Sequence, residues 1–132
     1  MDYNKGSRVV IIEAGVGGLA TAIALQRVGI DVHVYERCAD LTKILTGSGL
    51  HLWQNAVRAL QKLEAADRVQ AVSEVVEKME WRTLSGGLIA EWPVGDLSRQ
   101  LGASAIGIIR ADLADALRGA LHQGAVHRGW NS

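Results

Sequence analysis

The sequence RVVIIEAGVGGLATAIALQRVGIDVHVYER, residues 8–37, decides the fold of this chain. Residues 9–12 are a run of β-branched side chains, which is typical of a strand that is buried on both faces in a parallel sheet. A glycine-rich turn follows, then an alanine-rich helix over about residues 17–28 and a second strand over residues 31–37. This order of elements predicts an α/β fold with a parallel sheet and a Rossmann-like, dinucleotide-binding βαβ unit.

Three glycines, Gly15, Gly17 and Gly18, form the predicted turn, and we expect that a side chain would obstruct it. Gly15 would let a pyrophosphate approach the backbone N–H groups at the positive end of the helix dipole, and Gly18 would let the helix pack against the strand. Glu36 ends the second strand, where a carboxylate can bind both hydroxyls of a ribose. FAD and NAD(P) both fit this pattern, and a purely structural glycine-rich turn is the alternative.

Glu13 stands where the first glycine of a G-x-G-x-x-G fingerprint is expected. A residue with a Cβ atom held at positive φ costs roughly 1 kcal/mol or more. Its charge would also repel a nearby pyrophosphate by ~4 kcal/mol at about 4 Å and an effective dielectric near 20, although a carboxylate turned to solvent avoids most of this. The sequence therefore leaves open how strongly Glu13 weakens dinucleotide binding.

The composition indicates a soluble globular domain, with 48% hydrophobic and 21% charged residues in a chain of 132. Fourteen basic residues balance fourteen acidic ones without a run of like charge, so we expect neither a nucleic-acid partner nor a membrane surface. Without a signal peptide or an apolar run of roughly 18 residues, the expected compartment is the cytoplasm. Cys38 is the only cysteine and the four histidines lack metal-ligand spacing, so we expect no metal site.

The sequence after residue 37 predicts three further helices, a hairpin and two short strands. Apolar spacing favours helices over about residues 53–63 and 65–72, and a third from Asp112, where Asp115 would complete a capping box. The strand and hairpin predictions are a hairpin over residues 77–94 that turns at 85–87, a buried strand over 104–109 and the start of a strand over 124–130. Residues 39–52 show little periodicity.

Three segments together resemble the FAD-dependent aromatic-ring monooxygenases of the salicylate and 3-hydroxybenzoate hydroxylase type. The first is residues 9–37. The second, GSGLHLWQNAVRALQKL at residues 47–63, is similar to the family's G-x-G-[IL]-x-L-x-P-N-A-x-x-A-L segment, and the third, IIRADLADALRGAL at residues 108–121, to its arginine-plus-helix segment. The resemblance covers nearly the whole chain in order and favours FAD over NAD(P).

The resemblance also implies which residues surround the cofactor: Gly15, Gly17, Gly18, Glu36, Arg37, Gly49 and Arg110. The three glycines would face the pyrophosphate, Glu36 would hold the adenosine ribose, and Arg37 would lie beside the adenine. Arg110 would contact the cofactor, and Gly47 and Gly49 would belong to the loop near the flavin ring. Members of the family hydroxylate a small aromatic substrate after NAD(P)H reduces the FAD.

This sequence differs from the family pattern at Glu13, at Gln54, which replaces a proline, and at its end, which precedes the family's G-D motif. We therefore interpret residues 1–132 as a truncated, partial FAD-binding domain in which residues 77–94 begin the substrate-covering sheet. Turnover by this chain alone is not expected, because half a domain cannot shield a flavin from water. The alternatives are a non-catalytic remnant that associates as a homo-oligomer or with a complementing chain, and an NAD(P)-binding module.

Overall fold

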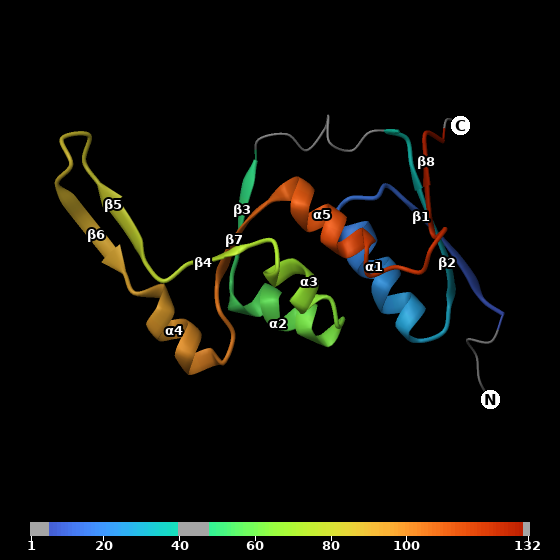
Figure 1. Ribbon diagram of the computed structural model, residues 1–132, viewed down its shortest axis with the longest axis horizontal. Helices are drawn as coiled ribbons and strands as arrows, with labels where there is room; N and C mark the ends of the chain where they lie inside the picture. Colours follow the sequence, from blue (N-terminus) through green and yellow to red (C-terminus); the bar gives the residue numbers. More distant parts are fainter. Residues whose placement is uncertain (1–5, 40–47, 131–132) are drawn as a thin grey trace.

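The computed structural model describes residues 6–39 and 48–130, which form three small sheets with helices between them. The strand orders are β1-β2-β8, β3-β7-β4 and β5-β6. Figure 1 shows the first sheet at one end of the molecule and the β5–β6 hairpin projecting at the other. The alternation of helices and strands confirms the predicted α/β class.

The first sheet contains the predicted βαβ unit. β1 (Arg8–Ile12) and β2 (Asp31–Glu36) are parallel neighbours, connected by α1 (Val16–Arg27). Gly29 follows the helix at φ +81°, the left-handed conformation that glycine adopts readily at a helix C-terminus. β8 (Val126–Arg128) pairs in parallel with β2 and adds a third strand to this sheet.

The prediction that residues 9–12 are buried on both faces is wrong. Val10 and Ile12 are 55% and 63% exposed, whereas Val32 and Val34 on the neighbouring strand are buried. Side chains alternate between the two faces of a strand. α1 and α5 (Arg110–Arg118) lie together on one side of this sheet in Figure 1, and no helix of the described residues lies on the other.

The second sheet pairs β7 (Ile106–Ile109) antiparallel with β3 (Gly49–Leu52) and β4 (Glu74–Val75). β7 confirms the strand expected near residues 104–109, but β3 and β4 were not predicted. The helices expected after residue 53 are present as α2 (Gln54–Lys62) and α3 (Ala66–Gln70).

Gln54, which stands in place of the family's proline, is the first residue of α2 and only 4% exposed. Its Nε2 donates to Ser98 Oγ at 3.1 Å, and Ser98 belongs to α4 (Val94–Leu101), a helix that was not predicted. Ser98 Oγ also donates to the Val94 carbonyl and accepts the Ala105 N–H. The glutamine therefore joins two helices through a buried, fully bonded hydroxyl.

The predicted hairpin is confirmed as β5 (Met79–Arg82) and β6 (Leu88–Trp92). The predicted start of the last helix at Asp112 is wrong. β7 runs directly into α5, so the helix begins at Arg110 with Ile109 as its N-cap, and no side chain caps it. Asp112 lies in the first turn, which excludes the capping box with Asp115.

Candidate functional site

The N-termini of α1 and α5 lie at the same edge of the first sheet. α1 connects two parallel strands and α5 leads into a third, so each helix runs antiparallel to the strands and begins at their carboxyl ends. Figure 1 shows the two helices side by side with their N-termini pointing the same way. In open parallel sheets, ligands bind outside this carboxyl edge.

The glycine-rich turn leads from β1 into α1, and Gly15 is the N-cap residue of that helix. A Cβ atom on Gly15 or Gly17 would meet nothing within 4 Å, so the expectation that a side chain would obstruct the turn is wrong for both. A Cβ atom on Gly18 would lie 2.3 Å from the Glu13 carbonyl oxygen, which confirms the close packing expected there. Space is therefore open outside the first two glycines and closed at the third.

Glu36 bridges the turn and the end of β2. Its Oε2 accepts the Ala14 N–H at 2.9 Å and its Oε1 accepts the Cys38 N–H at 2.8 Å. A carboxylate has about four lone-pair sites, so each oxygen retains capacity for another donor. Arg37 follows Glu36 and is exposed. The residues predicted from the first segment therefore lie together at one edge.

Glu13 is exposed and adopts φ +80°, the conformation that glycine normally supplies at this position of the turn. Its backbone N–H donates to the Tyr35 carbonyl at 2.8 Å, which continues the pairing of β1 with β2. This pairing holds the Glu13 backbone in the left-handed conformation, which costs about 1 kcal/mol or more for a residue that has a Cβ atom. The strain expected at Glu13 is therefore present in the fold.

Gly49 and Arg110 form a second group. Gly49 begins β3 and pairs with Ile109, and the Arg110 N–H donates to the Ser48 carbonyl at 3.0 Å. Arg110 is the exposed first residue of α5. The structure thus places both residues next to each other at the start of α5, whereas Gly47 lies outside the described residues.

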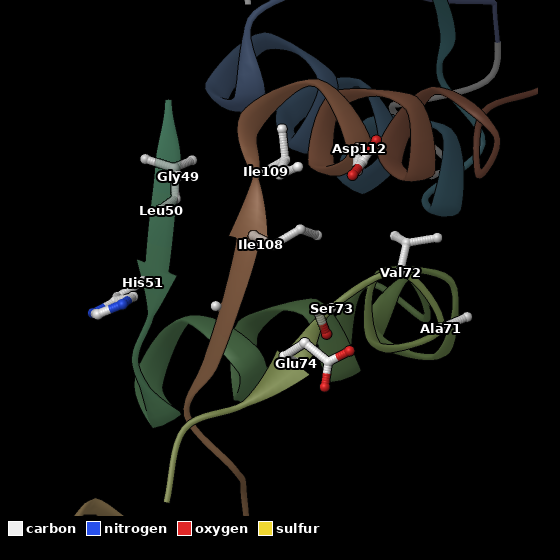
Figure 2. Close-up of a pocket in the computed structure, with 11 residues that line it drawn as sticks. Gly49, Leu50, His51, Ala71, Val72, Ser73, Glu74, Ile108, Ile109 and Asp112 are labelled. Atoms are coloured by element: carbon white, nitrogen blue, oxygen red, sulfur yellow. The ribbon is translucent and has the colours of Figure 1, made fainter. Parts of the chain in front are cut away.

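A cavity of about 870 Å³ adjoins this second group (Figure 2). In Figure 2, Asp112 lies across the hollow from Ser73 and Glu74, and His51 points away from it. The lining is formed by residues 49–51, 71–74 and 107–109 together with Asp112. The sequence did not predict this cavity, because its walls come from three segments that only the β3–β7–β4 pairing brings together.

The carboxyl edge fits the adenosine diphosphate half of a dinucleotide. The first turn of α1 carries no acidic side chain, its N-terminal backbone is approachable outside Gly15 and Gly17, and Glu36 retains acceptor capacity.

Over residues 6–39 and 48–130, no three His, Cys, Asp or Glu side chains are grouped to hold a metal ion. In the same ranges, no helix has the length and apolar character needed to cross a membrane.

Comparisons with known proteins identify relatives. No family model matches the chain. It is 36% identical over 128 residues to 3-amino-4-hydroxybenzoate 2-monooxygenase of Streptomyces cremeus, covering 96% of this chain and 32% of that protein. It is 33% identical over 107 residues to FAD-dependent urate hydroxylase of Mycolicibacterium vanbaalenii, covering 80% and 27%.

Solved structures share the fold. Klebsiella pneumoniae HpxO complexed with FAD and uric acid matches with a TM-score of 0.82 at 24% identity, over 96% of this chain and 32% of that one. The tetrameric form of 2-methyl-3-hydroxypyridine-5-carboxylic acid oxygenase matches with a TM-score of 0.75 at 27% identity, over 95% and 32%. The chain therefore spans about a third of the length of the relatives that it matches.

Proposed function

The chain belongs by sequence and fold to the FAD-dependent aromatic monooxygenases, and we propose that it holds the ADP half of FAD at the carboxyl edge of its first sheet. The observation that carries the proposal is the Glu36 carboxylate. Two backbone amides, from Ala14 and Cys38, fix it beside the open glycine turn. A carboxylate held in this way is preorganised to accept two ribose hydroxyls.

Each predicted residue has a role in this proposal. Gly15 and Gly17 leave room for the pyrophosphate at the N-terminus of α1, whose unpaired N–H groups favour an anion. Gly18 lets α1 approach β1 closely enough to aim those groups. Arg37, exposed directly after Glu36, is placed to flank the adenine.

Gly49 and Arg110 lie on the flavin side of the proposed site, at the start of α5 and beside the cavity of Figure 2. The Arg110 guanidinium would bind the part of the cofactor beyond the pyrophosphate. Bound FAD would supply the redox and oxygen chemistry. We propose hydroxylation of a small aromatic substrate, with NAD(P)H as reductant, for the whole protein of which this chain covers one cofactor-binding part.

FAD uptake tests the proposal. The chain is mixed with FAD, freed of unbound cofactor and examined for a visible flavin band, and its affinity is then titrated by flavin fluorescence. We expect Glu36→Ala to weaken binding at least about tenfold, because the ribose loses its acceptor and the turn loses two hydrogen bonds. Glu91→Ala, on the distant hairpin, is the matched carboxylate control and should leave the affinity unchanged.

Equal affinities of the Glu36→Ala variant and the original chain would remove Glu36 from the site. Uptake of NAD(P)H instead of FAD would favour the NAD(P)-binding alternative. Failure to bind either cofactor at about millimolar concentration would contradict the proposed function itself.

One observation favours self-association as a second candidate function. The β5–β6 hairpin exposes both of its faces, and Trp81, Ile89 and Trp92 are 46%, 66% and 44% exposed. Free strand edges with apolar side chains promote pairing between chains. A stable oligomer that takes up no FAD, measured by light scattering coupled to size exclusion, would support this candidate.

A further inference from the structure

A row of polar contacts crosses the face of the first sheet that the helices do not cover, which we call the open face. Arg8 Nε on β1 lies 2.7 Å from Asp31 Oδ2 on β2, and Asp31 Oδ1 lies 3.3 Å from His33 Nε2. His33 Nδ1 in turn lies 2.9 Å from His127 Nε2 on β8. The contacts join the three strands on the face opposite α1 and α5.

β8 is only three residues long and pairs in parallel with β2, in register from Val34–Val126 to Glu36–Arg128. The Val34 N–H donates to the Ala125 carbonyl at 2.8 Å, and the Trp130 N–H donates to the Glu36 carbonyl at 3.3 Å. The His127 ring stacks on Tyr35 with centroids 4.7 Å apart. The His33–His127 hydrogen bond adds a side-chain contact to this backbone pairing on the face opposite the helices.

The number of protons on the His33 and His127 rings decides whether the hydrogen bond between them can form. In the neutral pair, His33 Nε2–H faces Asp31 and His127 Nε2–H donates to His33 Nδ1. One added proton preserves the contact, because His33 Nδ1–H then donates to His127 Nε2. A second proton leaves a hydrogen on both facing nitrogens and a positive charge on both rings, so the 2.9 Å contact is lost.

A carboxylate lies beside the His33 ring. The Arg8 guanidinium, which donates to Asp31, holds the pKa of that carboxyl below its ordinary value, so Asp31 stays ionised beside His33. One carboxylate stabilises one imidazolium. The Tyr35 ring stacks on His127, and Arg128 follows His127 on β8.

We propose that His33 and His127 form a proton-operated latch, closed while the pair carries at most one extra proton and open when both rings are charged. Opening loosens the pairing of β8 with β2. Because Arg128 pairs with Glu36 in the strand register and the Trp130 N–H donates to the Glu36 carbonyl, opening also loosens the strand that flanks Glu36. The consequence for the cofactor rests on the proposed function, whereas the latch does not.

Amide hydrogen exchange tests the latch without any cofactor. The Val34 amide reports on β8 and the Glu13 amide, bound to the Tyr35 carbonyl, reports on the β1–β2 pair. We expect the Val34 protection factor to fall at least about tenfold between about pH 7.5 and about pH 5, while that of Glu13 changes by less than about twofold. Unchanged Val34 protection would overturn the proposal.

Two variants sharpen the test. His127→Phe keeps an aromatic ring against Tyr35 without titrating, and we expect it to abolish the pH dependence at Val34. His122→Phe, at an exposed histidine near β8, is the matched control and should retain that dependence. The same pH dependence in His127→Phe as in the original chain would overturn the proposal.

The imidazole ¹⁵N resonances of the original chain give a test that needs no variant. The latch predicts that the ring resonances of His33 and His127 change together in two coupled steps. Independent single-step titration of His33 and His127 would overturn it. A second measurement, with ADP added, tests the consequence for the cofactor: ADP affinity should fall with pH in parallel with Val34 protection. If ADP does not bind at about pH 7.5 while Val34 protection still depends on pH, the proposed function is contradicted and the latch is supported.

Discussion

The two faces of the β1–β2–β8 sheet share the same strands and differ in what covers them. On the helix side, Val32 and Val34 are buried against α1 and α5, together with Leu19 and Ala22 of α1. On the opposite side, Val10 and Ile12 are more than half exposed, and the line from Arg8 to His127 lies among them. Burial on the first face stabilises the fold, and the second face carries the polar contacts on which the proposed latch depends.

The proposed cofactor site, at the carboxyl ends of the strands in this sheet, lies where these two faces meet. Gly18 draws α1 against the covered face, and the Glu36 carboxylate closes the turn at the end of β2. On the other side of β2, β8 reaches the same strand end through the Trp130–Glu36 hydrogen bond. Substitutions on the two faces should therefore differ in their effects on stability.

The largest effect is expected at Gly18, where α1 lies closest to the backbone at the end of β1. Gly18→Ala places a Cβ atom 2.3 Å from the Glu13 carbonyl oxygen, and backbone must move to admit it. We expect a loss of about 3 kcal/mol in the free energy of unfolding, measured by urea denaturation. Gly17→Ala, one residue earlier in open space, is the control and should cost nothing; equal losses would show that α1 does not pack as described.

A matched pair of valines compares the two faces directly. Val34→Ala deletes two methyl groups from a fully buried site and should cost about 2 kcal/mol, whereas Val10→Ala on the open face should stay within about 0.5 kcal/mol. Both values come from the same denaturation experiment. A cost of more than about 1.5 kcal/mol for Val10→Ala would mean that something covers the open face in solution.

At the edge between the faces, Glu13→Gly should relieve the strain at φ +80°. We expect a gain of about 1 kcal/mol in stability and at least about tenfold tighter FAD binding, because both the strained Cβ atom and the negative charge are removed. Thermal unfolding and flavin fluorescence titration measure the two effects. Equal FAD affinities for the two proteins would show that Glu13 does not oppose the cofactor.

The smallest effect is expected on the hairpin, where both faces are open. The hydrogen bond from Arg82, followed by that from Lys78, lowers the pKa of Glu80 from its ordinary value of 4.5 to about 2. Any stabilisation from these ion pairs is therefore present above about pH 4.5 and lost as the pH falls towards 2. Carboxyl ¹³C titration should show this lowered value, and Arg82→Gln should return it towards 4.5; an ordinary value in the original chain would contradict the ion pairs.

Residues 8–37 could be predicted from sequence because every signal there is local. A β-branched run, a glycine turn and an acid at a strand end each specify their own structure, and even the positive φ of Glu13 follows from its place in the turn. The exposure of Val10 and Ile12 could not be predicted, because it depends on what packs against the sheet and not on the strand itself.

Elements that depend on distant pairing were missed. β3 is four residues long, and its backbone is specified by β7 far along the chain. α4 begins after Pro93 and is held by the Gln54–Ser98 hydrogen bond, which no local pattern reveals. The cavity beside Gly49 follows from the same pairings, so only the glycine at its rim was found from sequence.

Backbone amide chemical shifts measured with added ADP test whether the cofactor binds at this edge of the sheet. We predict shifts concentrated at residues 14–18 and 36–38, where the turn, the N-terminus of α1 and Glu36 meet, with no change at residues 79–92 of the hairpin. Shifts confined to other residues, or no shifts at about millimolar ADP, would contradict the assignment of the cofactor site to this edge.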